Sequence, residues 1–133
     1  MRFNTKDITY YNQPFDHWVL DNFLDVNDAK KLSKQFIDFD NPTEEIIHYK
    51  GWIGEKRTCN RWDRFPPLTY STFSNLLSDK FIDKLSDITG ISPLYPDIGL
   101  HGGGWHMSGK GGSLAMHLDY SIHPKMNLQR KLN

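Results

Sequence analysis

The sequence has little cysteine, no imbalance of charge and no long apolar run. Its 133 residues contain one cysteine, Cys59, so no disulfide can form within the chain. Sixteen basic residues balance sixteen acidic ones, which removes the net positive charge that attracts nucleic acid or an anionic membrane. No run approaches the roughly 18 apolar residues of a membrane span, and residues 2–7 are polar rather than signal-like. We therefore expect a soluble, intracellular (cytoplasmic) protein that enters no membrane.

The stretch from residue 52 to residue 64 is rich in aromatic and basic side chains. A nucleic-acid-binding module would use such residues, but one short basic stretch in a neutral protein is weak support for that function. Clusters of this kind usually pack over the edge of a core, so we do not expect nucleic-acid binding. Cys59 lies in the same stretch, and without an assignable partner histidine we expect it to be a structural thiol. The aromatic and basic residues are Trp52, Arg57, Arg61, Trp62 and Arg64.

The first 96 residues favour one strand followed by helices. Large apolar residues predict a short strand with a following turn over residues 17–24. Asp25 or Asn27 can cap a helix that ends near residue 38. Gly51 and Gly54 suggest turns around a hairpin within residues 43–64. The apolar positions of the first helix are Ala29, Leu32 and Phe36.

Two further helices are predicted before the chain changes character. One starts at Pro66 and Pro67 and continues to residue 77. Ser78 or Asp79 can cap the next, which Gly90 ends. From residue 97 onward the sequence is glycine-rich and strand-like, and helices followed by strands indicate an α+β or helix-buttressed, mainly β domain. The apolar face of the last helix consists of Phe81, Ile82, Leu85 and Ile88.

A histidine and an aspartate lie two residues apart in a segment that alternates like a β-strand. Because residues i and i+2 of a strand point to the same face, a strand over residues 113–120 would place His117 and Asp119 side by side. Such a pair can hold one divalent cation and supplies two of the three ligands of the two-His-one-carboxylate facial triad of Fe(II) oxygenases. On spacing alone, an ordinary polar strand face is the alternative. The opposite face would carry Leu114, Met116, Leu118 and Tyr120.

The other histidines do not complete this set. His101 and His106 have opposite parity along an extended run over residues 98–107, so at most one can share a face with the pair. His123 precedes Pro124 and is expected to be structural or solvent-facing, in a turn. The runs 98–107 and 113–120 flank a glycine-rich connection, which suggests a hairpin or a loop beside a site. The remaining histidines, which are isolated, are His17 and His48.

Five motifs follow one another between residue 94 and residue 133. They are Gly-Gly-Gly-Trp-His at 102–106, Gly-Gly-Ser-Leu at 111–114, His-Leu-Asp-Tyr at 117–120, His-Pro-Lys at 123–125 and Leu-Gln-Arg-Lys-Leu-Asn at 128–133. In this order they resemble the Fe(II)/2-oxoglutarate-dependent oxygenases of the prolyl 4-hydroxylase-like branch. Residues 15–24 and the helix after them also resemble the way many members begin.

This resemblance implies a fold, a metal and a reaction. His117 and Asp119 would be ligands of Fe(II), with 2-oxoglutarate as cosubstrate and ascorbate as the family's reductant. The fold would be part of a double-stranded β-helix, or jelly-roll, in which residues 1–96 supply the N-terminal strand and buttressing helices and residues 97–133 the first core strands. The reaction would hydroxylate a protein or small-molecule substrate while 2-oxoglutarate is oxidatively decarboxylated to succinate.

Two functional residues of the family have no counterpart in this sequence. Relatives carry a second histidine well downstream of the His-X-Asp motif, followed by a basic residue that binds the distal carboxylate of 2-oxoglutarate. Both positions fall beyond Asn133, so residues 1–133 are expected to form a single incomplete domain that is inactive until further chain or a second polypeptide completes it. The alternative is a non-catalytic interaction remnant whose exposed strands pair with a partner chain.

Overall fold

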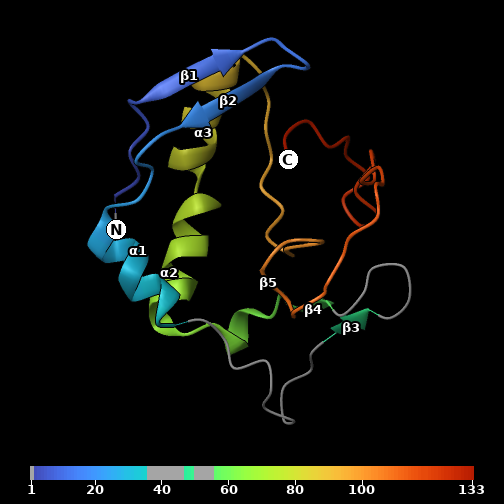
Figure 1. The fold of residues 1–133 in the computed structure, drawn as a ribbon. Helices are drawn as coiled ribbons and strands as arrows, with labels where there is room; N and C mark the ends of the chain where they lie inside the picture. Colours follow the sequence, from blue (N-terminus) through green and yellow to red (C-terminus); the bar gives the residue numbers. More distant parts are fainter. Residues whose placement is uncertain (1, 36–46, 50–55) are drawn as a thin grey trace.

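Two small antiparallel sheets and three helices make up an α+β fold (Figure 1). The computed structural model describes residues 2–35, 47–49 and 56–133. The predicted α+β class is confirmed. These ranges contain no closed barrel, so the jelly-roll stays a prediction. The elements in chain order are β1 (Ile8–Tyr11), β2 (His17–Leu20), α1 (Val26–Ser33), β3 (Ile47–Tyr49), β4 (Lys56–Cys59), the 3-10 turn η1 (Trp62–Arg64), α2 (Pro67–Leu76), α3 (Asp79–Thr89) and β5 (Trp105–Ser108).

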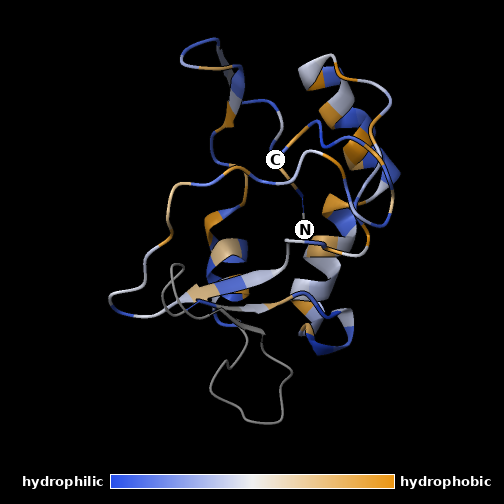
Figure 2. Cartoon of the chain, turned by 90° about the vertical axis from the view of Figure 1, so that its right-hand side faces the viewer, coloured by the Kyte–Doolittle hydropathy of each residue, from blue (hydrophilic) through white to orange (hydrophobic). Residues whose placement is uncertain are grey.

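The helices begin at the residues that local chemistry predicts. The Asp25 carboxylate accepts hydrogen bonds from the first backbone N–H groups of α1, and the Ser78 hydroxyl does the same for α3. Pro67 opens α2, and Gly90 ends α3 in the left-handed region, with φ of 71°. Helix α1 ends at Ser33 with Lys34 as its C-cap, so it stops before the expected end near residue 38; Phe36 and residues 37–38 lie outside the described residues. In Figure 2 the helices carry both hydrophobic and hydrophilic residues.

No helix in the described ranges combines the length and the apolar character that crossing a membrane would require.

Strands β1 and β2 form an N-terminal hairpin that is joined to α3 through aromatic contacts. The predicted strand within residues 17–24 is confirmed as β2, whereas its partner β1 was not expected. Phe3 stacks on Phe23, with ring centroids 4.8 Å apart, and both rings contact Phe81 of α3 edge-on. These three aromatic rings connect the segments flanking the hairpin to the helices.

The second sheet has the strand order β3-β4-β5, all antiparallel. The hairpin predicted within residues 43–64 is confirmed as β3 and β4, and its turn residues Gly51 and Gly54 lie outside the described residues. Strand β5 pairs with β4, so that Cys59 faces Trp105 across the ladder. The hairpin suggested between residues 98–107 and 113–120 is not formed: β5 pairs with β4 on one side, and residues 113–120 do not pair with its other edge.

The core lies where β4 and β5 meet α2. Cys59, Phe65 and Leu100 are buried at its centre, and Cys59 is a free thiol, as expected. Gly104 enters this contact with φ of 98°, and a Cβ atom at this position would collide with the carbonyl oxygen of Cys59. Only glycine lets the two strands approach this closely. The half-buried residues around the centre are Trp62, Phe73, Leu77, Trp105 and Met107.

Residues 111–119, here termed the arm, leave the sheets as an extended segment (Figure 1). The strand predicted over residues 113–120 is not formed, which corrects that expectation. Within the described ranges, no backbone hydrogen bond joins residues 113–119 to another strand, so the arm has the alternation of a strand without a sheet. Its apolar residues Leu114, Met116 and Leu118 are exposed.

Candidate metal centre

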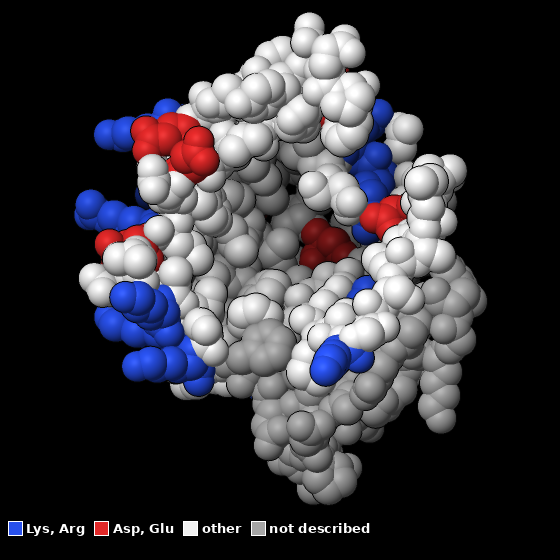
Figure 3. All heavy atoms as spheres, in the orientation of Figure 1, with Lys and Arg blue, Asp and Glu red and all other residues white. Residues whose placement is uncertain are grey.

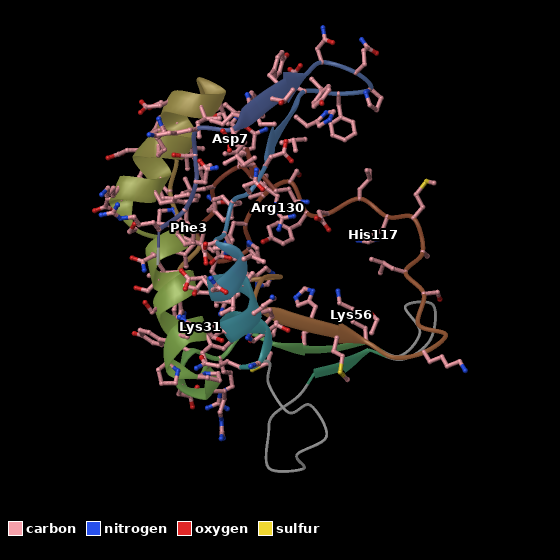
Figure 4. All side chains as sticks on the ribbon, turned by 60° about the vertical axis from the view of Figure 1, so that its left-hand side comes forward. Phe3, Asp7, Lys31, Lys56, His117 and Arg130 are labelled. Carbon is pink, nitrogen blue, oxygen red and sulfur yellow. The ribbon has the colours of Figure 1, made fainter. Side chains whose placement is uncertain are left out.

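The arm brings the side chains of His117 and Asp119 together. Its extended backbone keeps residues two apart on one side, so the Nε2 atom of His117 lies 3.4 Å from the Oδ1 atom of Asp119. The two side chains are 38% and 45% exposed, which leaves both accessible to solvent. Figure 4 labels His117 on the arm, well away from the helices.

A backbone carbonyl fixes which nitrogen of His117 carries the proton. The Nδ1 atom lies 2.8 Å from the carbonyl oxygen of Ala115. Because a carbonyl oxygen can only accept, Nδ1 is the donor, and in the neutral ring Nε2 carries a lone pair. Nε2 lies 3.4 Å from a carboxylate oxygen of Asp119. Two acceptors at that distance repel unless a proton on Nε2 or a cation between them makes the contact favourable.

The separation of the two atoms fits a shared divalent ion. Nitrogen and oxygen ligands each about 2.1 Å from one ion lie about 3.0 to 3.4 Å apart when they occupy adjacent positions. His117 and Asp119 match that separation. In the described ranges, however, no three His, Cys, Asp or Glu side chains are grouped so that they could hold a metal. The pair fits two positions of a facial triad, and the third ligand is missing from this part of the chain.

The second oxygen of Asp119 is held by two donors that the sequence did not reveal. The Nη1 atom of Arg130 donates to Oδ2 over 2.8 Å, and the side-chain amide of Asn133 donates to the same oxygen over 3.1 Å. The guanidinium of Arg130 also lies 4.0 Å from the centre of the Tyr120 ring. Oδ1 therefore remains free to face His117. The sequence indicated only that Arg130 and Asn133 follow the His123-Pro124 turn.

His123, which was expected to be structural or solvent-facing, is buried within its turn. Its Nδ1 atom accepts hydrogen bonds from the backbone N–H groups of Lys125 and Met126, which closes that turn. The ring proton therefore lies on Nε2, which is 3.3 Å from Oδ1 of Asp97 but forms no hydrogen bond with it. This is the opposite tautomer to that of His117. Because the protonated Nε2 has no lone pair to offer a cation, this tautomer does not make the pair a metal site.

Neither His101 nor His106 joins the metal pair. The ring of His101 packs edge-on against Tyr120, with centroids 5.2 Å apart. His106 on β5 donates from Nε2 to the carbonyl oxygen of Gly103 over 3.2 Å, and partial burial together with the positive charge of Lys56 lowers its pKa. The ring of His17 stacks on Tyr11, while the side chain of His48 lies outside the described residues.

A cavity of about 520 Å³ lies between α3 and the segments on both sides of the arm. Ile82 and Leu85 of α3 line it, together with Leu100 and Leu128. The volume falls in the range of small-molecule sites. Figure 3 shows the molecule hollowed at its centre in the view of Figure 1. Polar residues of the lining include Asp97, His101, Tyr120, His123 and Arg130.

The basic and aromatic stretch packs at the edge of the core. The Trp62 ring contacts Phe65 and Tyr70 edge-on, and its Nε1 donates to the carbonyl oxygen of Ile98. Arg61 donates to both carboxylate oxygens of Asp63. These contacts agree with the expectation that the stretch packs over the edge of the core. Trp52 and the side chain of Arg57 lie outside the described residues.

Comparison with known proteins gives no match to a family model, a curated protein or a solved structure.

Proposed function

We propose that this chain is part of an Fe(II)- and 2-oxoglutarate-dependent dioxygenase of the prolyl 4-hydroxylase-like type. The observation that supports this proposal most strongly is the pair of acceptor atoms, Nε2 of His117 and Oδ1 of Asp119, which face each other at 3.4 Å. The tautomer of His117 leaves Nε2 free to coordinate a metal, and Asp119 keeps one oxygen free. Both features are typical of metal ligands with ordered outer partners.

In this proposal the chain provides part of the site. His117 and Asp119 hold Fe(II), and polypeptide outside these 133 residues supplies the third ligand and the basic residue that binds 2-oxoglutarate. The bound Fe(II) and 2-oxoglutarate would supply the oxidation chemistry, with ascorbate as reductant and a protein or small molecule as the hydroxylated substrate. The arm would become a core strand of a completed jelly-roll. We place the activity in the reducing interior of the cell, in keeping with the free thiol of Cys59.

A second function, a non-catalytic interaction module, is favoured by one observation on the arm. Its backbone groups have no strand partner in the described ranges, and Leu114, Met116 and Leu118 are exposed along it. An extended edge of this kind can add a strand from a partner chain. This function requires no metal, so iron dependence separates the two proposals.

The first test measures Fe(II) binding by calorimetry under anaerobic conditions. We expect the chain to bind one Fe(II) ion, and His117→Ala and Asp119→Ala to weaken binding by at least about tenfold, because each removes one of two protein ligands. His17→Ala is the matched control, since the ring of His17 on β2 contacts Tyr11 and the carbonyl oxygen of Phe15 rather than a carboxylate. Unchanged binding in both ligand variants would refute the metal site.

The second test measures succinate formation from 2-oxoglutarate. We expect turnover when the chain is co-expressed with the coding sequence that follows codon 133, and loss of that turnover in the His117→Ala variant. A folded chain that shows neither Fe(II) binding nor iron-dependent succinate formation, with or without the added sequence, would favour the interaction module instead.

A further inference from the structure

We propose that Arg130 is a positioning residue that holds the Asp119 carboxylate in its metal-binding orientation. This inference rests on the proposed metal site. It goes beyond that site by assigning a role to a residue that the family pattern treats only as the opening of the next core strand.

The geometry of the Asp119 carboxylate supports this role. Both hydrogen bonds from Arg130 and Asn133 reach Oδ2, and Oδ1 alone faces His117. A carboxylate on an extended arm without a strand partner can rotate about its terminal bond, which changes the direction in which its two equivalent oxygens point. Two donors on one oxygen restrict that torsion and keep the other oxygen near His117.

Arg130 is itself held in place by the turn that precedes it. Its backbone N–H donates to the carbonyl oxygen of Ser121 over 2.8 Å, and its guanidinium covers the Tyr120 ring. The bridge between Ile122 and Gln129 closes this turn just before Arg130. The Tyr120 hydroxyl donates to the carbonyl oxygen of His101 over 2.7 Å, which joins the turn to the rest of the fold. Arg130 therefore connects the anchored turn to the exposed end of the arm.

This arrangement also bears on 2-oxoglutarate. A guanidinium that donates to Asp119 and stacks on Tyr120 is already engaged, and its side chain is 22% exposed. Arg130 is thus poorly placed to serve as the basic residue for the distal carboxylate of the cosubstrate. Its contacts instead direct it toward the metal ligand Asp119.

Two effects of Arg130 on metal affinity have opposite signs. Its positive charge partly neutralises Asp119, so removing only the charge would strengthen the binding of a cation. Its hydrogen bond orients Oδ1, so removing the orientation would weaken binding, as the loss of outer partners of metal ligands typically does. If Arg130 acts as a positioning residue, the loss of orientation outweighs the loss of charge, and removing Arg130 weakens metal binding. If the charge matters more, removing Arg130 strengthens metal binding.

The test is a titration of the full chain with Mn²⁺ followed by electron paramagnetic resonance. We expect Arg130→Met to weaken Mn²⁺ binding about 10- to 100-fold. Arg130→Lys should restore part of the affinity, because an ammonium group can donate to Oδ2. Lys125→Met is the matched control for the loss of a positive charge on the same turn, and it should bind like the original chain.

The outcomes separate the two proposals. If the original chain binds no Mn²⁺, the metal site itself fails. If it binds Mn²⁺ while Arg130→Met binds equally or more tightly, the positioning role is overturned and the metal site stands. Circular dichroism reports whether Arg130→Met folds. Should it not fold, Arg130→Gln is titrated in its place, because it shortens the side chain and removes the guanidinium that donates to Oδ2; affinity equal to that of the original chain would overturn the positioning role.

Discussion

At the residue scale, the position of a single ring proton separates two histidine–carboxylate pairs. The Nδ1–H group of His117 donates to a backbone carbonyl, which leaves the unprotonated Nε2 beside Asp119. His123 accepts hydrogen bonds from backbone N–H groups at Nδ1 and carries its proton on Nε2, 3.3 Å from Asp97. The two-residue spacing in the sequence predicted that His117 and Asp119 meet. It could not predict the tautomers, because these depend on hydrogen bonds that form only in the folded chain.

His106 gives a prediction at this scale. Burial and the nearby charge of Lys56 lower its pKa below the ordinary value of 6.5. The folded state therefore favours the neutral ring. As the pH falls below 6.5, the unfolded chain takes up a proton on His106 more readily than the folded chain does, so the free energy of unfolding should decrease. Lys56→Met should raise the pKa of His106 in a titration followed by nuclear magnetic resonance. A His106 pKa that does not change in this variant would exclude the charge as a cause.

At the scale of elements, local sequence patterns predicted the helices correctly, but they predicted a strand over residues 113–120 that has no partner strand in the described ranges and is not formed. Capping by Asp25 and Ser78 and the stop at Gly90 are properties of neighbouring residues, so α1 and α3 could be predicted from sequence. The alternation of residues 113–120 was as regular as that of a strand, yet a strand also requires a neighbour to share its hydrogen bonds. Strand β5 takes its neighbour from β4, far back in the chain, and no local pattern could show this.

Gly104 tests the contact between β4 and β5. Gly104→Ala should lower the free energy of unfolding by at least about 2 kcal/mol, because its Cβ would collide with backbone and its φ is strained for alanine. Gly111→Ala is the matched control, since Gly111 has φ of 80° but nothing within 4 Å of the added Cβ. That variant should lose only about 1 kcal/mol. Chemical denaturation measures both, and equal losses would argue against a packed β4–β5 contact at Gly104.

At the scale of the whole molecule, the buried core is small and much apolar surface stays exposed. Cys59, Phe65 and Leu100 are the buried hydrophobic residues of the described ranges, while Leu114 and Leu118 on the arm face solvent. The sequence predicted the α+β class from the order of its elements, but it could not predict the cavity, whose walls come from α3 and from both sides of the arm.

The exposed arm and the buried core should respond differently to substitution. Leu114→Ser combined with Leu118→Ser should reduce the binding of an apolar fluorescent dye and leave the melting temperature unchanged, because neither side chain is buried. Phe65→Ala should instead cost about 3 to 5 kcal/mol of unfolding free energy. A large loss of stability in the arm variant would mean that the arm packs against the body in solution.

The most direct measurement for the proposed metal site is a nitrogen-15 magnetic resonance spectrum of the His117 ring, recorded with and without Zn²⁺. Zn²⁺ is diamagnetic and accepts the same nitrogen and oxygen ligands. We expect Nδ1 to remain protonated throughout and the Nε2 resonance to shift on addition of Zn²⁺, with no such shift at His123. A proton found on Nε2 of His117 in the neutral ring, or an Nε2 resonance that ignores the metal, would contradict the assignment of His117 and Asp119 as metal ligands.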